Sequence, residues 1–460
     1  MPKSKVLFFS RNYQSSLFPA INTTLFDTVH VTLTVREKMK VEMAGGIVVG
    51  CLEEEYHKLL PIEIEFPYLT YSMGADRFLR GMSHDERLIV LKKTVAFWRG
   101  ILENYRPFCL VNEPVAIEAS EVLMIEAQRL KITYLTFGSF FKDNTFYFYE
   151  YSPKRKALFE KNNSIEPTES DRRIAETLIQ DIKKGYKPSY VKNISHRKSI
   201  SRLYKLIHKY LLNLYFTIKI RDLAVRQLCY GMGIDRVVWQ TNLYLRSYIY
   251  SFRYDRISVI DNSKYRYLLF PLHLEPEAVL YYGAPYYDNQ ITFIENILKC
   301  ICEDHVLIVK EHPQQPGYLL QKSFRKIKDR FPNVLYLQSE IDSRVLINKV
   351  ETIITLGGST GFEGLVFNKK VINYGRVFYD AFEGVINMHS YEELAKYLRY
   401  DDEPENVNAD LAGYVAKIIQ LLNNGNPFPH TQLYSEDNIY LISNAFEREF
   451  LRIFNLKNVE

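Results

Sequence analysis

The chain contains few cysteines, glycines and prolines and no long hydrophobic run, and each shortage excludes a class of protein. Its five cysteines are sparse, odd in number and without the spacing of zinc ligands, which excludes a disulfide scaffold and favours a reducing compartment. Twenty glycines and eighteen prolines among 460 residues are too few for a fibrous or low-complexity protein. No uninterrupted apolar stretch reaches the ~18 residues of a transmembrane helix, and the amino terminus lacks a signal-peptide pattern. We therefore expect a folded, cytoplasmic protein.

What the chain does contain is typical of globular domains. Hydrophobic residues make up 47% and charged residues 25% of the sequence, so extended disorder is excluded. At roughly 150 residues per domain, the length predicts two or three domains. The formal net charge of +5 is mild for this length, and we expect no nucleic-acid partner.

Short apolar runs alternate with longer segments of helical periodicity in the first and last thirds of the sequence. Over 86–105, for example, Leu91, Val95 and Trp98 recur at a helical spacing. Such alternation predicts parallel sheets with helices on their faces. We expect an α/β protein with two Rossmann-like domains facing a cleft and a helical insertion. The predicted ranges are 1–150 for the first domain, 151–260 for the insertion, 261–430 for the second domain, and 431–460 for a C-terminal helix that packs back on the first domain.

The predicted insertion contains a basic, aromatic segment. Between Lys192 and Arg226 there are nine lysines and arginines but one acidic residue, Asp222, with large apolar side chains between them. One interpretation is a helical hairpin whose apolar face packs on the core while its charges face water. The alternative is peripheral docking to the anionic inner face of a membrane, where a lipid-linked acceptor would be found. The sequence leaves both open.

A first candidate anion site lies at residues 309–313. Lys310, His312 and Pro313 end an apolar strand, and ligands of open α/β sheets bind at the carboxyl ends of strands. Pro313 fixes the backbone after the histidine, whose imidazole can stabilise a departing phosphate. The alternative is a histidine that caps a turn.

A second candidate anion site is the turn at residues 352–364. A predicted strand leads into a turn that contains Gly358, Ser359 and Thr360, and a helix is predicted to begin near Gly361. The first N–H groups of that helix and the two hydroxyls suit a phosphate, although the segment is neither a P-loop nor a dinucleotide fingerprint. Glu363, expected in the first helical turn, either accepts a hydrogen bond from a ribose hydroxyl or complements the helix dipole.

Carboxylates occur in two further loops. Glu113 ends a strand, and Pro114 suits the first position of a helix predicted over 114–130. Glutamate is disfavoured as an N-cap, so a general base or nucleophile is the interpretation that we favour for Glu113. The loop at 270–277 gathers His273, Glu275 and Glu277. This loop is either part of a ligand site or a solvated turn.

In order and spacing, segments 270–287, 310–313 and 358–363 resemble the capsular polysaccharide synthesis family, which includes bacterial β-Kdo transferases. Kdo is 3-deoxy-D-manno-oct-2-ulosonic acid. The match spans roughly Tyr267 to Tyr379, whereas the first 150 residues match only in pattern. The resemblance implies a GT-B glycosyltransferase that uses a CMP-activated ulosonic acid with retention and without an obligatory metal.

The resemblance also implies residue roles. The segments around His312 and Ser359 are similar to CMP-binding elements of some bacterial sialyltransferases. Carried over, His312, Ser359 and Thr360 hold the donor phosphate and Glu363 holds the cytidine ribose. Retention implies an inward carboxylate, which Glu113 matches by position. The predicted site comprises catalytic Glu113 and His273, secondary candidates Glu275 and Glu277, and donor-binding Lys310, His312, Pro313, Gly358, Ser359, Thr360 and Glu363.

We therefore predict a glycosyltransferase that moves Kdo from CMP-Kdo to a growing capsule or lipopolysaccharide glycan. The expected partners are a nucleotide-sugar donor and a glycan or glycolipid acceptor, and no metal or other cofactor is expected. One alternative is another donor, either a CMP-nonulosonate or a UDP-sugar. A second is a UDP-GlcNAc 2-epimerase, although in those enzymes the Gly/Ser turn is usually followed by paired acidic residues, which this chain lacks at 357–364. The third alternative is a non-catalytic binding protein.

Overall fold

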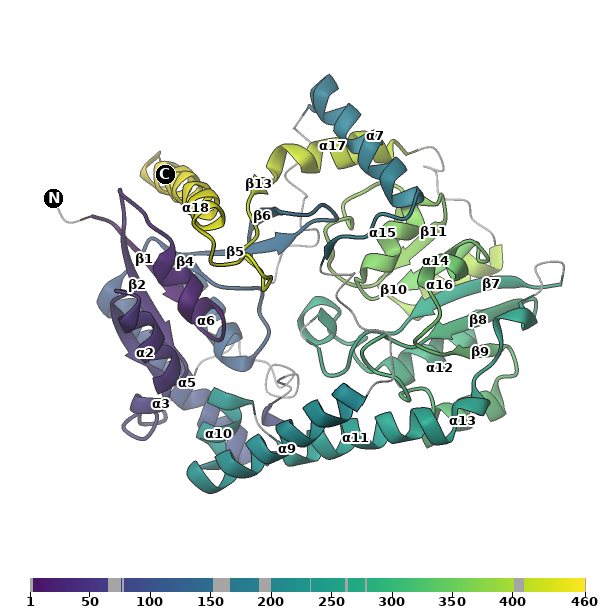
Figure 1. The fold of residues 1–460 in the computed structure, drawn as a ribbon, viewed down its shortest axis with the longest axis horizontal. Coiled ribbons are helices and arrows are strands. Elements are labelled where there is room, and N and C mark those ends of the chain that lie inside the picture. Colours follow the sequence, from purple (N-terminus) through teal and green to yellow (C-terminus); the bar gives the residue numbers. More distant parts are fainter. Residues whose placement is uncertain are drawn as a thin grey trace. The chain divides into compact units, whose positions relative to one another are not determined.

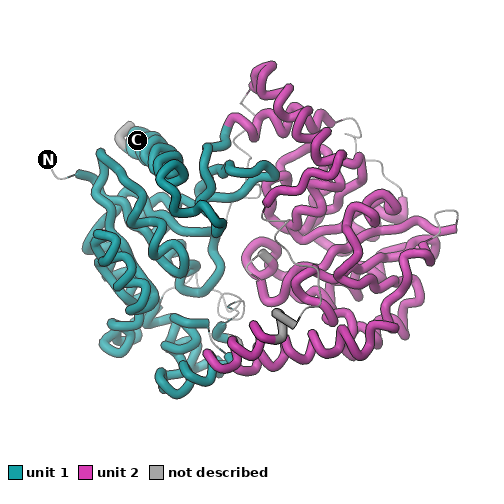
Figure 2. Tube along the Cα trace, viewed as in Figure 1, with its two compact units in different colours: residues 1–155, 213–233, 421–460 teal, residues 156–212, 234–420 magenta. Residues whose placement is uncertain are grey.

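The chain divides into two compact units (Figure 2). Each unit contains one sheet. The computed structural model describes residues 3–64, 76, 78–151, 166–189, 200–231, 233–260, 264–277, 279–400 and 409–459. Unit 1 comprises residues 1–155, 213–233 and 421–460, and unit 2 comprises residues 156–212 and 234–420. Part of the predicted insertion, residues 213–233, therefore belongs to unit 1, and the returning tail begins at residue 421 rather than 431.

Unit 1 contains a seven-stranded sheet in the order β13-β6-β5-β4-β1-β2-β3 (Figure 1). Strands β1 to β5 are parallel, whereas β6 and β13 pair antiparallel. Its elements are β1 (Lys5–Phe9), α1 (Gln14–Leu17), β2 (Asp27–Thr32), α2 (Val35–Met43), β3 (Val48–Cys51), α3 (Leu52–Glu55), α5 (His84–Tyr105), β4 (Cys109–Val111), α6 (Glu118–Arg129), β5 (Thr133–Ser139), β6 (Thr145–Glu150), α10 (Leu223–Tyr230), β13 (Asn423–Asn424) and α18 (Glu436–Val459).

The C-terminal helix α18 packs on the sheet of unit 1. Ile442, Phe446 and Phe450 recur every four residues, so they share one face of the helix. This face joins a buried aromatic cluster with Phe8 of β1 and Phe137 of β5. Apolar burial of this extent is the main term that holds α18 on the sheet.

Unit 2 contains a six-stranded, all-parallel sheet in the order β12-β11-β10-β7-β8-β9. Helix α9 (Ile200–Lys219) includes residues assigned to both units. The other elements of unit 2 are α7 (Glu169–Lys183), α11 (Ile234–Ile249), β7 (Arg266–Pro271), α12 (Gln290–Cys300), β8 (His305–Lys310), α13 (Lys322–Arg330), β9 (Val334–Leu337), α14 (Ser343–Ile347), β10 (Thr352–Thr355), α15 (Ser359–Val366), β11 (Lys370–Asn373), β12 (Val385–Asn387), α16 (Tyr391–Tyr400) and α17 (Leu411–Leu421).

Helices cover both faces of the sheet of unit 2. Leu268 and Phe270 of β7 lie in one apolar cluster with side chains of α12, α13 and α16. Tyr267 and Leu269, which point to the opposite face, lie in a second cluster with side chains of α14. Strands that are buried on both faces explain why β7 and β8 are almost continuously apolar in the sequence.

The structure confirms the prediction of an α/β protein with two Rossmann-like domains, the pair of domains that defines the GT-B class. In each sheet the first three strands along the chain lie side by side in sequence order. The strands that follow are added on the other side of the first strand, as in Rossmann domains. The described part of 151–260 forms helices and no strands. One local prediction is wrong: α6 begins at Glu118, so Pro114 lies in the preceding loop. Among the described residues, no helix is both long and apolar enough to cross a bilayer.

Candidate functional site

The sheet of unit 2 reverses its strand order between β7 and β10. At such a switch point the loops from two neighbouring strands leave toward opposite faces, and the carboxyl ends of the strands are open to ligands. His273 follows β7, and the turn at Gly358 follows β10. A Cβ built on Gly358 would lie 3.2 Å from His273 Cε1 and 3.5 Å from its Nε2. The fold therefore brings these two predicted site segments into contact.

The turn between β10 and α15 is held by one threonine. The Oγ1 atom of Thr355 accepts hydrogen bonds from the N–H groups of Gly357 (3.2 Å) and Gly358 (2.9 Å). The hydroxyl of Tyr379 donates to the carbonyl of Gly358 at 2.5 Å. Helix α15 begins at the next residue, and no side chain of the described residues caps it. Its first N–H groups, with the partly buried hydroxyls of Ser359 and Thr360, are arranged to accept an anion.

His273 is a neutral polar group beside this helix start. Its main chain is fixed by Gln290, whose Oε1 accepts the N–H of His273 at 2.7 Å. The residue is 8% exposed, and burial lowers the pKa of His273 to about 4. Its Nε2 atom has no hydrogen-bond partner among the residues that the structure describes. Because a buried ring nitrogen is costly to leave unpaired, a ligand group at this place is favoured.

The loop after β8 presents His312. The Nδ1 atom of His312 accepts the N–H of Gln314 at 3.2 Å, so in the neutral ring the proton lies on Nε2. Glu311 is buried and organises the loop, because its carboxylate accepts the N–H groups of Leu319 (2.8 Å) and Gly317 (3.1 Å). Burial raises the pKa of Glu311 to about 7. The predicted strand-end position of this segment is confirmed.

Lys310 is less open to a ligand than the sequence suggested. Its side chain is buried, and Nζ donates to the carbonyls of Glu311 (3.1 Å) and Ser339 (3.5 Å). Burial lowers the pKa of Lys310 to about 8, so it remains mostly protonated at neutral pH. Its role in donor binding stays a prediction, as does that of the partly buried Pro313.

The loop at 271–277 is tied to the loop after β8. The amide of Gln315 accepts from the N–H of Glu275 at 2.9 Å and donates to its carbonyl at 2.7 Å. The hydroxyl of Tyr318 donates to the carboxylate of Glu275. Glu275 therefore has a structural partner, and Glu277 lies in the same partly buried loop. Their roles as secondary catalytic candidates stay predictions.

Glu363 lies in a buried ion pair. The Nε atom of Arg344 donates to its Oε1 at 2.7 Å, with side-chain exposures of 11% and 8%. Burial raises the pKa of Glu363, and the contact with Arg344 opposes this effect. Because α15 begins at Ser359, Glu363 is in the second turn of the helix, and the prediction of the first turn is wrong. Its contact with a ribose stays a prediction.

In unit 1, Glu113 occupies the corresponding switch point, between β1 and β4. The hydroxyl of Tyr13 donates to its Oε1, and a guanidinium nitrogen of Arg11 lies 3.6 Å from Oε2. Burial, and then the charge of Glu113, raise the pKa of Tyr13, which keeps it a neutral donor. The side chain of Glu113 is 26% exposed. It precedes the first residue of α6 by five positions, so it is not the N-cap of that helix.

Sequence reasoning missed the residues that hold these candidates. Arg11 and Tyr13 follow β1, and their place after the first strand was the available signal. Thr355 was hidden because a threonine at a strand end also fits ordinary β propensity. Arg344 and Gln315 are far in sequence from Glu363 and Glu275, so no local pattern indicates these pairs.

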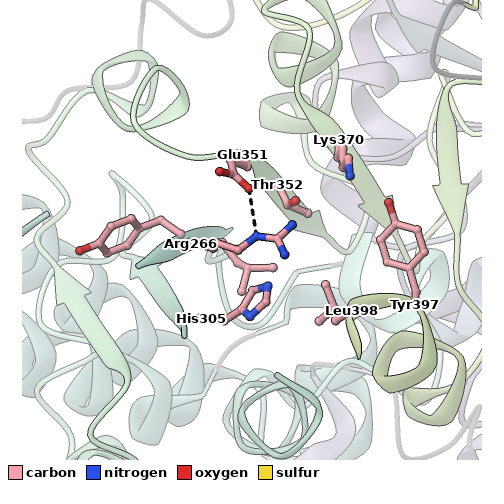
Figure 3. A pocket seen from close by; sticks show the side chains of 9 residues that line it. Arg266, His305, Glu351, Thr352, Lys370, Tyr397 and Leu398 are labelled. Carbon is pink, nitrogen blue, oxygen red and sulfur yellow. Dashed lines mark hydrogen bonds and ion pairs between the residues drawn. The ribbon is translucent and has the colours of Figure 1, made fainter. Parts of the chain in front are cut away.

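The opposite edge of the sheet in unit 2 also has a hollow, lined by Arg266, His305, Glu351 and others (Figure 3). Its volume is about 10 Å³, enough for about one water molecule. Next to His305, Cys302 and Asp304 complete a group of potential metal ligands whose atoms lie within 4.8 Å of one another. His305 is the first residue of β8 and Lys310 the last, so this group is remote from the loop of His312.

Residues 189–424, just over half of the chain, match the family described as capsule polysaccharide biosynthesis protein. The chain belongs to this family. The resemblance inferred from the sequence is thereby confirmed, and the matched range includes both candidate anion sites of unit 2. Among curated protein sequences, none matches the chain.

Solved structures similar to this capsule biosynthesis family member include three from different organisms. KpsC of Thermosulfurimonas dismutans, a β-Kdo 2,4 transferase, is 15% identical over 74% of this chain and 87% of that chain, with a TM-score of 0.37. A UDP-GlcNAc 2-epimerase of Methanocaldococcus jannaschii, in complex with UDP-GlcNAc and UDP, is 15% identical over 90% and 98%, with a TM-score of 0.28. Anabaena Alr3699/HepE, in complex with UDP-glucose, is 11% identical over 98% and 99%, with a TM-score of 0.27. Identities this low leave the substrate to be argued from the residues of this chain.

Proposed function

We propose that this protein is a glycosyltransferase that transfers Kdo from CMP-Kdo to a capsule glycan with retention of configuration. The observation that carries the proposal is the open start of α15 at the switch point of unit 2, beside the Nε2 atom of His273, which has no hydrogen-bond partner among the described residues. A CMP-ulosonate brings a phosphate and a sugar carboxylate, and both need donors of this kind.

The chemistry requires that negative charge be stabilised on the departing CMP. When the bond between the anomeric carbon and the phosphate oxygen breaks, its electron pair leaves with the phosphate. Fixed N–H groups, the hydroxyls of Ser359 and Thr360, and the imidazoles of His273 and His312 are donors for this charge. We propose that these donors take the place of a metal, so that a chelator leaves turnover unchanged.

Retention requires two displacements, and we assign the carboxylate nucleophile to Glu113. In the first step its oxygen bonds to the anomeric carbon as CMP leaves. In the second step an acceptor hydroxyl replaces the carboxylate and gives its proton to a general base. The contacts of Glu113 with Tyr13 and Arg11 support this assignment, because they hold its carboxylate in one orientation.

The test begins with nucleotide binding by the purified protein. CMP at 100 times its dissociation constant stabilises the fold by about 2.7 kcal/mol, and UMP, UDP and GDP at the same concentration stabilise it less. A Ser359→Ala/Thr360→Val variant loses most of this shift. Incubation with CMP-Kdo and a capsule oligosaccharide then yields a β-linked product by NMR.

Two results would redirect the proposal. A larger thermal shift with UDP than with CMP removes the Kdo assignment and favours a UDP-sugar transferase. Conversion of UDP-GlcNAc to its 2-epimer without an acceptor identifies an epimerase instead. A CMP-nonulosonate donor is distinguished from CMP-Kdo by comparing the two donors in the transfer assay.

A further inference from the structure

Helix α9 exposes its apolar side chains instead of burying them. Of its described side chains, 204–219, only Leu206 and Asn213 are buried. The following large apolar residues are between 41% and 72% exposed: Tyr204, Ile207, Tyr210, Leu211, Leu214, Tyr215 and Ile218. Of the two interpretations that the sequence left open, the one in which the apolar face of this segment packs on the core is therefore wrong for the described side chains of α9.

The exposed residues form a face rather than a scatter. Positions 204, 207, 211, 214 and 218 are spaced by three or four residues, which places them on one side of the helix. Single apolar residues scattered over a protein surface are common, but a contiguous apolar stripe indicates a binding surface.

Helix α11 extends this apolar surface within unit 2. An apolar groove of about 260 Å³ is lined by both helices, through Leu206, Ile207 and Tyr210 of α9 and Val238, Thr241 and Asn242 of α11. Further along α11, Leu245 and Ile249 are 46% and 61% exposed. We call Tyr204, Ile207, Tyr210 and Leu211 of α9, with Val238, Leu245 and Ile249 of α11, the α9–α11 surface; all of these residues belong to unit 2.

The charge of α9 selects among possible occupants. The helix contains Arg202, Lys205, Lys209 and Lys219 and no acidic residue. Lys205 and Lys209 are exposed beside Ile207 and the groove. A second copy of the chain, placed symmetrically on this surface, would bring like charges together and is disfavoured. An anionic surface with an apolar interior complements both features.

We propose that the α9–α11 surface docks on a bilayer that contains anionic phospholipids. Apolar side chains enter the boundary between headgroups and acyl chains, while the lysines remain at the phosphates. The exposed tyrosines suit this depth, since their rings are apolar and their hydroxyls stay hydrated. Because α9 is too polar to cross a bilayer, the helix lies in the plane of the surface.

Sedimentation with vesicles tests this proposal on the full chain. The protein is mixed with vesicles of phosphatidylcholine alone, or of phosphatidylcholine with phosphatidylglycerol, at low and high salt. We expect binding only to the anionic vesicles, with weaker binding at high salt. Lys205→Gln/Lys209→Gln weakens this binding by roughly 30-fold, about five-fold for each lysine. Ile207→Asn/Leu211→Asn abolishes it.

A matched control is available on α13. Lys322→Gln/Lys326→Gln makes the same change of charge at two exposed positions of a helix whose large apolar residues, Phe324 and Ile327, are buried, and leaves binding unchanged. Unchanged unfolding midpoints show that the variants fold. The salt dependence of wild-type binding tests the proposal independently of any variant. Equal binding to both kinds of vesicle, or binding to neither, overturns the proposal. So does a concentration-dependent dimer that Ile207→Asn/Leu211→Asn dissociates.

Discussion

The switch points of the two sheets share a backbone arrangement and differ in chemistry. In unit 2, α15 starts four residues after the end of β10, and its first N–H groups have no capping side chain among the described residues. In unit 1, α6 starts seven residues after β4, and two side chains accept hydrogen bonds from N–H groups at its amino end. Asp76 accepts the N–H of Glu118 at 2.7 Å, and Ser120 accepts the N–H of Ala116 at 3.1 Å.

This difference decides which charge each switch point can receive. The open helix start of unit 2 is suited to an anionic ligand. In unit 1 the first N–H group of the helix already binds Asp76, and the carboxylate of Glu113, beside Arg11 and Tyr13, is partly exposed. A Rossmann-like sheet therefore fixes where a site lies, while the loop lengths and their side chains decide what it does.

The largest effect that separates the two switch points is expected from Glu113→Ala. As the proposed nucleophile, Glu113 is needed for chemistry rather than for donor binding, so kcat falls by at least about 1000-fold. The thermal shift with CMP stays unchanged. Glu103→Ala, an exposed carboxylate of the same unit, serves as the control. Turnover near the wild-type value with Glu113→Ala would move the nucleophile to Glu275 or Glu277.

His273→Ala tests the switch point of unit 2. Loss of one preorganised donor to a departing anion lowers kcat by roughly 100-fold, and the shift with CMP also becomes smaller. Steady-state kinetics with CMP-Kdo and titration with CMP measure the two effects. His389→Ala, at an exposed histidine of the same unit, should change neither. A purely structural role for His273 would reduce stability while leaving kcat intact.

Glu311 predicts how stability depends on pH. Its folded pKa of about 7 lies above the ordinary value of 4.5, so the folded state binds the proton more tightly than the unfolded chain. The resulting stabilisation is full below about pH 4.5 and is lost as pH rises through 7. Relative to Glu311→Gln, the wild type should therefore lose about 2 kcal/mol between pH 5 and pH 8. Denaturant unfolding at both pH values measures this difference, and a constant difference contradicts it.

Tyr13→Phe is expected to have the smallest effect. It removes the hydroxyl that orients Glu113 but leaves the carboxylate in place, so kcat falls by about tenfold and KM for the donor is unchanged. Tyr440→Phe, at an exposed tyrosine on α18, is the control. A fall as large as that of Glu113→Ala would make Tyr13 itself a reacting group.

The sequence by itself determined the fold class and much of the unit 2 site. Alternating apolar runs and helical periods predicted the parallel sheets, because burial on two faces requires apolar strands. The strand-end positions of His312 and of the turn at Ser359 followed from the same local patterns, since a parallel strand and the turn after it are adjacent in the chain.

Only the tertiary structure decided which residues meet. The contact of His273 with Gly358, the ion pair of Arg344 with Glu363, and the bond of Tyr13 to Glu113 join residues that are 19 to 100 positions apart. Local patterns carry no record of such pairs, because strand order and loop path bring them together. The exposed face of α9 was undecidable for the same reason: an amphipathic period shows that a helix has an apolar side, and only the packed chain shows whether anything covers it.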